Sequence, residues 1–392
     1  MASERPLPLR ATAVLGLVTI IGFGAWFYGY GVLLEPIRRD TGWSETLLSS
    51  TYGVSLFGSG LLATVAGRLL HRRGSKVVYG AGSIVVMASY LGVAASNGPI
   101  VFAVLGTVAG SVTGALGYYA AVHTIIAQLV PSKHRAATIT ANTLWGAFAS
   151  PVFLPLVAWM VLRLEWRMTL RVIGVAVAAA FLLVTTIVPD SRGRDQEALP
   201  IRAVLASVGR DRAILALLTT TFVGGMVTSL LILYQVPVMT TAGLTLVAAS
   251  ALAGARGFLQ LGGRIPMPWL IRRFGSRATL SAAHALTAVS CVLLPLAGTL
   301  GMAVAFALVA GLAIGALVPV ESIFSADAVA DDSIGMVLGA SSLTRGVGAA
   351  LGPVLGGSLT AIAGTRTPAL LIVGVFAMGA ALLVPSISER SE

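Results

Sequence analysis

The stretch Gly67-Arg-Leu-Leu-His-Arg-Arg-Gly-Ser-Lys76 has a counterpart later in the chain, Leu270-Ile-Arg-Arg-Phe-Gly-Ser-Arg277. Gly74 aligns with Gly275, an offset of 201 residues (275 − 74). Each copy is rich in basic residues and follows the second long apolar segment of its half of the sequence. The repeat therefore predicts that the chain is built from two equivalent halves.

Apolar segments fill most of the sequence on either side of these loops. Of the 392 residues, 56% are hydrophobic and 10% are charged, whereas a soluble domain carries about 25% charged residues. A membrane span needs about 20 apolar residues. This length predicts twelve spans, at residues 11–34, 48–70, 77–96, 100–122, 136–162, 168–189, 213–236, 245–269, 278–297, 299–322, 335–360 and 367–386. We expect an all-α membrane protein with twelve transmembrane helices in two six-helix halves.

The two halves are predicted at residues 1–189 and 213–392, and a linker at 190–212 joins them. The stretch from Pro189 to Arg212 carries five arginines and four acidic residues, which interrupts the apolar pattern. We interpret it as a cytoplasmic connection between two six-helix bundles.

Short basic loops give the predicted orientation in the membrane. The loop at 67–76 holds four Lys or Arg residues and no acid, and the loop at 272–277 holds three arginines and no acid. Because cytoplasmic loops carry an excess of such residues, we place both loops and both termini in the cytoplasm of a bacterial-type inner membrane. The charged segment 35–45 then forms an external loop. The same rule accounts for the net charge of +11 without a nucleic-acid partner.

Motifs for catalysis and metal binding are missing from the sequence. Cys291 is the single cysteine, so it has no partner for an internal disulfide or a cysteine metal site. His123 and His284 are isolated histidines that we expect to be structural. The chain has no Gly-x-x-x-x-Gly-Lys-Ser/Thr phosphate loop. We predict no enzymatic activity, no cofactor and no metal.

Three arginines lie inside predicted spans, Arg256 and Arg264 in the eighth and Arg345 in the eleventh. A charge at the bilayer centre costs at least about 2.5–3.5 kcal/mol on insertion scales, so such residues are functional candidates. Glu321 is the one acid expected at comparable depth. A guanidinium stays charged and binds a carboxylate through two parallel hydrogen bonds. The surplus of positive charge predicts a small organic anion held by Arg264 and Arg345, with Arg256 assisting.

Each of these charges also has a structural interpretation. Arg264 and Arg345 can pair with Glu321 or with helix carbonyls. Arg256 lies about 80° around the helix from Arg264, which leaves its role evenly balanced between site and scaffold. Glu321 is either a structural acid or a protonatable group that couples protons to the anion.

Uncharged side chains in the spans are further candidates for the same site. Aromatic rings with a polar tip can line a cavity or pack between helices, and amides can bind the anion or bridge two helices. These candidates are Trp26, Tyr28, Tyr30, Tyr118, Tyr119, Asn142 and Gln260.

The repeated loop and the twelve spans resemble the major facilitator superfamily over nearly the whole chain. The loop motif of that family reads Gly-x-Leu-x-Asp-Arg-x-Gly-Arg-Lys, and the stretch 67–76 matches it except that His71 replaces the aspartate. The second copy has Arg272 at that place. In the family this aspartate helps to latch the inward gate, so the resemblance leaves the latch of this chain without its usual acid. The gating positions that it implies are Gly67, Arg72, Gly74, Lys76, Arg273, Gly275 and Arg277.

Within the superfamily, four stretches look like the monocarboxylate transporters and the bacterial oxalate/formate antiporter. They are Gly22-Phe-Gly-Ala-Trp-Phe-Tyr-Gly-Tyr-Gly-Val-Leu-Leu-Glu-Pro36, Gly42-Trp-Ser44, Pro131-Ser-Lys-His-Arg-Ala136 and Glu165-Trp-Arg167. The resemblance implies an exchange-type or proton-coupled carrier of small carboxylates, with its site at mid-membrane between the halves.

The same resemblance assigns roles to particular residues. Arg264 matches the register of an arginine in the eighth span of the monocarboxylate carriers, and Arg345 matches a cation in the eleventh span of the oxalate exchanger. Gln260 stands where the carriers have an aspartate tied to proton coupling. Exchange or uniport is therefore favoured over proton symport.

Two other functions fit parts of the sequence. A proton-driven exporter of drugs or natural products usually has a Gly-Pro motif in its fifth span, and Gly146-Ala-Phe-Ala-Ser-Pro151 is a partial match. A membrane sensor would be expected to carry an appended soluble domain. We expect instead a monomeric carrier in a lipid bilayer whose partners are the organic anion and protons.

Overall fold

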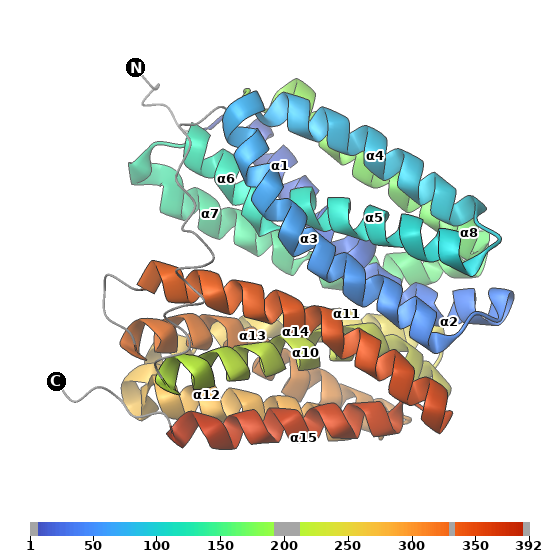
Figure 1. The fold of residues 1–392 in the computed structure, drawn as a ribbon, viewed down its shortest axis with the longest axis vertical. Coiled ribbons are helices and arrows are strands. Elements are labelled where there is room, and N and C mark those ends of the chain that lie inside the picture. The colour runs from blue at the N-terminus through green and yellow to red at the C-terminus, as the bar shows by residue number, and fades with distance from the viewer. Residues whose placement is uncertain (1–6, 192–211, 329–333, 387–392) are drawn as a thin grey trace. The chain divides into compact units, whose positions relative to one another are not determined.

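The computed structural model describes residues 7–191, 212–328 and 334–386, and every regular element in these ranges is helical (Figure 1). In the first half the elements are α1 (Leu9–Gly22), the π-helix η1 (Phe23–Tyr28), α2 (Gly29–Thr41), α3 (Glu45–Arg73), α4 (Ser75–Ala95), α5 (Pro99–Gly117), α6 (Tyr119–Leu129), α7 (Ser132–Ala147) and α8 (Ala149–Ile187). In the second half they are α10 (Arg212–Thr241), α11 (Leu246–Arg264), α12 (Met267–Leu293), α13 (Leu300–Ala328), α14 (Ile334–Ala363), α15 (Thr367–Leu383) and the 3₁₀ turn η3 (Val384–Ser386).

The lengths of these helices suit a membrane. Eight helical stretches of the described chain are long and apolar enough to cross one. The longest, 132–187, contains the fifth and sixth predicted spans, which join at Glu165. Large apolar side chains face outward on several helices, for example Ile84 (71% exposed), Val375 (70%) and Leu382 (72%). Such faces are those that lipid would cover.

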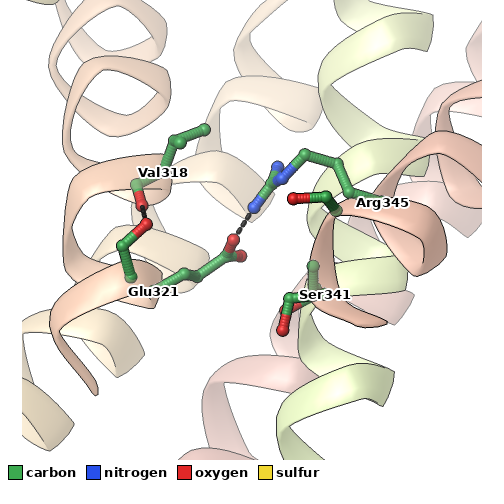
Figure 2. Close-up of a pocket in the computed structure, with 7 residues that line it drawn as sticks. Val318, Glu321, Ser341 and Arg345 are labelled. Carbon is green, nitrogen blue, oxygen red and sulfur yellow. Dashed lines mark hydrogen bonds and ion pairs between the residues drawn. The ribbon is translucent and has the colours of Figure 1, made fainter. Parts of the chain in front are cut away.

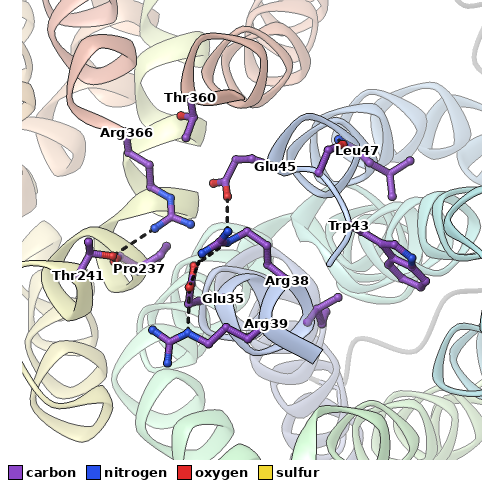
Figure 3. A network of polar contacts seen from close by, with 12 residues as sticks. Glu35, Arg38, Arg39, Trp43, Glu45, Leu47, Pro237, Thr241, Thr360 and Arg366 are labelled. Atoms are coloured by element: carbon purple, nitrogen blue, oxygen red, sulfur yellow. Dashed lines mark hydrogen bonds and ion pairs between the residues drawn. The ribbon is translucent and has the colours of Figure 1, made fainter. Parts of the chain in front are cut away.

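The ends of several predicted spans are wrong. Residues 35–41 were expected in an external loop but continue α2, where Glu35 pairs with Arg38 (2.8 Å) and Arg39 (3.0 Å) (Figure 3). Pairs at these spacings stabilise a helix. The loop expected around 163–171 is likewise helical except at Glu165.

Four predicted spans are also interrupted inside the apolar segment. The first contains the π-helix at Phe23–Tyr28, the fourth breaks at Tyr118, the fifth at Phe148, and the eighth at Ile265 and Pro266. The first two breaks lie near a close crossing of helices, since a Cβ on Gly22 would lie 2.6 Å from the backbone of Gly117. The sequence pattern does not reveal such crossings.

The chain divides into two compact units, residues 1–196 and 197–392, so the division falls within 190–212. Residues 192–211 of the expected linker lie outside the described ranges. In the first unit the main contacts join α3 to α5, α4 to α8, and α1 to α7 and α8. In the second unit they join α11 to α13, α12 to α15 and α10 to α14. These are the same three pairings of spans, so the two units repeat one packing scheme.

The repeated loop also has a repeated backbone conformation. Gly74 has φ 84° and ψ 163°, and Gly275 has φ 81° and ψ 160°. Such angles are accessible to glycine and cost other residues free energy. The two glycines therefore turn the chain in the same way at equivalent places.

Glu165 is the one described non-glycine residue with positive φ, at φ 63° and ψ 168°. This region costs about 1–3 kcal/mol for a residue with a Cβ, and glycine gives back about 0.5–1 kcal/mol through its larger entropy loss. The Glu165 side chain is exposed. We therefore predict that Glu165→Gly stabilises the purified protein by about 1 kcal/mol. Thermal unfolding in detergent measures this as a higher Tm. Glu165→Ala, which keeps the Cβ, is the control, and an equal rise in that variant would show that backbone strain is not the cause.

Candidate functional site

A cavity of about 380 Å³ lies inside the second unit, between α10, α13 and α14. It is lined by Thr221, Val318, Glu321, Ser322, Ser341, Ser342 and Arg345 (Figure 2). Two of the charged residues singled out in the sequence, Glu321 and Arg345, therefore share one cavity. Arg256 and Arg264 do not line it.

Arg345 and Glu321 form an ion pair across this cavity, from α14 to α13 (Figure 2). The side chains are 23% and 5% exposed. The structural alternative for Arg345, pairing with Glu321, is thus observed. It changes the electrostatic argument, because the paired cavity has no formal surplus of positive charge. An anion must displace the Glu321 carboxylate, or a proton must neutralise it, before Arg345 can bind.

Glycines bring α14 close enough to α10 to place Arg345 at this cavity. A Cβ on Gly225 would lie 2.3 Å from the carbonyl oxygen of Arg345, and one on Gly348 would lie 2.0 Å from that of Phe222. Small residues permit this backbone approach in membrane helices. Gly348, the second glycine after Arg345, therefore has a packing role, whereas a Cβ on Gly346 would meet no atom within 4 Å.

Hydroxyl groups around the ion pair have unused hydrogen-bonding capacity. The Oγ1 of Thr221 and the Oγ of Ser341 are buried without a hydrogen-bond partner among the described residues. Buried polar groups in folded proteins normally have partners, including water or a ligand. The cavity is therefore suited to a small polar guest.

His284 reaches the same cluster from α12. It is fully buried, and its Nε2 lies 3.8 Å from Oε1 of Glu321. Within the described chain neither ring nitrogen has a hydrogen-bond partner. A Cβ added to Gly224 of α10 would lie 2.9 Å from Glu321 Oε1 and 3.5 Å from His284 Cε1. Sequence reasoning treated this histidine as structural, because only the fold brings it beside an acid.

Arg256 lies in a separate environment on α11. It is fully buried, and its Nε donates to Oε1 of Gln235 on α10 at 2.7 Å. The amide of Gln235 donates in turn to the carbonyl of Ile232 at 3.2 Å. Arg256 therefore ties α11 to α10, as its scaffold interpretation predicts.

Arg264 occupies the last turn of α11, immediately before the break at Ile265. It is half-buried, and its Nε has no hydrogen-bond partner among the described residues. Gln260, one turn earlier, is buried and lies against Gly315 of α13. A Cβ added to Gly315 would lie 2.2 Å from the carbonyl oxygen of Gln260. Gln260 thus marks a close crossing of α11 and α13, whereas Arg264 keeps binding capacity.

Two aromatic candidates of the first unit are fixed by internal hydrogen bonds. Trp26 donates through Nε1 to Oγ of Ser55 at 2.7 Å, and Tyr30 donates through its hydroxyl to the carbonyl of Leu48 at 2.8 Å. Each side chain is 1% exposed. Their polar groups are already satisfied, so packing accounts for both.

Tyr28 and Tyr119 belong to a group of rings around the π-helix. Phe23 stacks on Tyr118 with centroids 4.3 Å apart and lies 4.8 Å from Tyr119 and 6.5 Å from Tyr28. The hydroxyl of Tyr119 donates to the carbonyl of Thr143 at 3.3 Å.

Asn142 also has a partner within the first unit. Its side-chain nitrogen donates to Oγ1 of Thr19 at 3.1 Å, and the side chain is 1% exposed. This bond joins α7 to α1, which supports the helix-bridging interpretation of Asn142.

Two of the four stretches that carry the carboxylate-carrier resemblance, 42–44 and 165–167, come close to each other through Phe102. Oδ2 of Asp40 accepts hydrogen bonds from Nε1 of Trp166 (2.9 Å) and from Arg167, and the Arg167 guanidinium lies 4.2 Å above the Trp166 ring. Trp43 and Trp166 both pack on Phe102. These residues join α2 and α8, so the motif is a structural brace and carries no direct information on cargo.

The gating loop of the first unit contains an acid that sequence reasoning missed. The backbone N–H of Lys76 donates to Oδ1 of Asp190 at 3.2 Å, and a Cβ on Gly74 would lie 2.4 Å from that oxygen. His71, at the usual place of the aspartate, contacts Nε2 of Gln128 through Nδ1 at 3.0 Å. Asp190 follows α8, which is why a motif read along 67–76 does not find it. Gly275 of the second copy has no atom within 4 Å of an added Cβ.

Solved structures of low sequence identity share this fold. A mutant of the nucleoside transporter NupG aligns with a TM-score of 0.82 at 13% identity, over 97% of this chain and 100% of that chain. A bacterial homologue of the human lysosomal transporter Spinster, inward-facing and unoccupied, gives a TM-score of 0.74 at 15% identity, over 96% of each chain. A D-xylose–proton symporter gives 0.69 at 17%, also over 96% of each. At these identities the likeness establishes the fold alone.

Sequence comparison establishes the family. No curated protein sequence matches this chain. The family model described as Major Facilitator Superfamily matches residues 14–280 and 237–391, which together cover nearly the whole chain. With the all-helical fold and the repeated packing of its two units, the chain belongs to the Major Facilitator Superfamily of membrane transporters.

Proposed function

We propose that this transporter carries a small organic anion, a mono- or dicarboxylate, and that Arg345 is the group that binds it. The supporting observation is the cavity in which Arg345 faces Glu321 and the hydroxyls of Thr221 and Ser341, which have no hydrogen-bond partner among the described residues. A guanidinium matches the planar geometry of a carboxylate. The carboxylate of the cargo would therefore take the place of the Glu321 carboxylate as the partner of Arg345.

This exchange of partners explains how a buried arginine can serve a transport cycle. Removing one partner from a buried ion pair costs about 3–5 kcal/mol. Arg345 is therefore best kept paired at every stage, with Glu321 when the site is empty and with the anion when it is loaded. Such a site favours exchange of anions or uptake linked to a proton that neutralises Glu321.

Arg264 is proposed as a second anion contact, since its Nε has no hydrogen-bond partner in the described chain. Arg256, which binds Gln235, is proposed as a scaffold that holds α11. We further propose a monomer in a bacterial-type inner membrane with both termini in the cytoplasm, on the basis of the basic loops at 67–76 and 272–277.

A proton-driven exporter is the second candidate function. The buried carboxylate of Glu321 supports it, because a cationic drug could pair with this acid when Arg345 moves away. The two functions differ in which member of the ion pair meets the cargo, so variants of the pair distinguish them.

We predict that Arg345→Ala lowers carboxylate counterflow about 10- to 100-fold, because a hydrogen bond to a charged group contributes about 1.5–3 kcal/mol. Arg345→Lys should fall between this variant and the wild type, since it keeps the charge and loses the two-pronged geometry. The measurement is counterflow of radiolabelled formate, lactate, oxalate and succinate in proteoliposomes. Arg163→Ala, on an exposed arginine of the first unit, is the matched control. Undiminished counterflow in Arg345→Ala would end the proposal, and cation flux lost in Glu321→Gln but kept in Arg345→Ala would support the exporter.

We also predict that Glu321→Gln destabilises the empty protein by about 3–5 kcal/mol, because it leaves the Arg345 charge without its acid. A carboxylate that binds Arg345 should restore part of this loss, since a ligand stabilises the folded state that binds it. The shift in Tm on adding the best anion of the panel should therefore be larger in Glu321→Gln than in the wild type. An equal or smaller shift would mean that the anion does not compete with Glu321.

A further inference from the structure

Four helices of the second unit meet at His284, Glu321 and Arg345. His284 comes from α12, Glu321 from α13 and Arg345 from α14, while Gly224 of α10 leaves the space that an added Cβ would remove. His284 and Glu321 are 0% and 5% exposed in their side chains. The proposed function uses Arg345 and Glu321 and leaves the buried imidazole without a role.

We propose that His284 and Glu321 together form a proton-binding site that controls the release of Arg345 to its anion. The inference rests on the proposed function, because it takes Arg345 as the group that meets the cargo. In the empty state Glu321 is a carboxylate paired with Arg345, and His284 is a neutral imidazole.

One proton then changes the charge of this cluster from zero to plus one. The proton comes from water in the cavity and binds a carboxylate oxygen of Glu321, which becomes a carboxylic acid. The 3.8 Å between Glu321 Oε1 and His284 Nε2 is slightly longer than a hydrogen bond, so a small rotation of the carboxyl lets its O–H donate to the free nitrogen. Arg345 keeps its charge and loses its partner, and one cargo carboxylate restores neutrality. The site therefore takes up one proton with one carboxylate group.

Few other ionisable groups can compete for this proton. Helix α11, which packs on α13, carries Arg256 and Arg264; these are cations that do not line the cavity. On α12, Arg277 and Cys291 lie seven residues away on either side of His284, about 10 Å along the helix. The α15 segment, Thr367–Leu383, and the turn Val384–Ser386 contain no ionisable side chain. Helix α13 has Asp327 six residues beyond Glu321, about 9 Å along the axis. On α10, Arg212 and Tyr234 lie 12 and 10 residues from Gly224, at least about 15 Å along the helix. Arg345 is the ionisable residue of α14 over Ile334–Ala363.

The histidine also explains how the site can use protons although Gln260 replaces the aspartate of the carboxylate carriers. Glu321 supplies the acid from α13, whereas the aspartate of the carriers corresponds to Gln260 on α11. His284 supplies an acceptor for the proton of Glu321. The proton site then lies at the cavity itself, where its occupation directly changes the partner of Arg345.

The decisive experiment titrates the empty purified protein, without any carboxylate, by infrared difference spectroscopy between pH 5 and 9. The carboxylic-acid C=O band that is absent in Glu321→Gln reports the protonation of Glu321. We expect its midpoint to move by about one pH unit or more in His284→Gln, because the proton acceptor is lost. His134→Gln, at an exposed histidine of the first unit, should leave the midpoint unchanged.

A second variant approaches the site from another helix and does not alter the histidine. Gly224→Ala places a methyl group 2.9 Å from Glu321 Oε1 and should also move the midpoint. An unchanged midpoint in a folded His284→Gln or Gly224→Ala variant, or no Glu321 band in this pH range, overturns the proposal.

A transport assay separates this inference from the proposed function. In proteoliposomes His284→Gln should lose the accumulation of lactate or oxalate that a pH gradient drives, because the proton that accompanies the carboxylate has lost its acceptor. Arg163→Ala, at an exposed arginine of the first unit, should keep that accumulation. Wild-type protein that exchanges none of the carboxylates defeats the anion proposal while the infrared titration still tests the proton site. Gradient-driven accumulation that survives in His284→Gln defeats the proton site alone.

Discussion

The cost of an unpaired charge in a low-dielectric interior is the constraint on which this structure most depends. Arg345 cannot lose its proton to escape that cost, so an acid must reach it from another helix. Glu321 does so from α13, and the glycine contacts between α10 and α14 set the distance. Under the proposed function the cargo of Arg345 has to meet the same electrostatic requirement, so a carboxylate that takes the place of Glu321 is the kind of ligand that suits this site.

Comparison of the two units separates the features that serve packing, which the units share, from their interior polar side chains, which they do not share. Both units use the same three helix pairings and the same loop conformation at Gly74 and Gly275. Their polar interiors differ. In the first unit Trp26, Tyr30 and Asn142 have partners within the unit. The second unit holds the ion pair of Arg345 and Glu321 at a cavity, whereas the ion pairs Arg38–Glu35 and Arg167–Asp40 of the first unit involve more exposed side chains.

Much of the fold could be predicted from the sequence, because span length and the repeated loop are local signals. The interruptions of the helices could not be predicted from the sequence, since they arise where backbones cross, as at Gly22 and Gly117. For the candidate site, the sequence singles out Arg345 and Glu321 as charges in apolar segments, but their pairing depends on how α13 and α14 are rotated. The partner of Arg256, Gln235, lies on another helix, and so does the neighbour of His284.

The absence of a motif residue from its usual chain position is therefore weak evidence that its chemical group is absent from that place in the fold. The loop 67–76 lacks its aspartate, yet the carboxylate of Asp190 reaches the same turn from the end of α8 and accepts the N–H of Lys76. Gln260 stands on α11 where the resemblance leads one to expect an acid, yet Glu321 presents a carboxylate from α13. In both cases a neighbouring helix supplies the charge, because a helix bundle brings several elements to one point. What the protein requires is a carboxylate at a place in space, and the chain position that provides it is free to change.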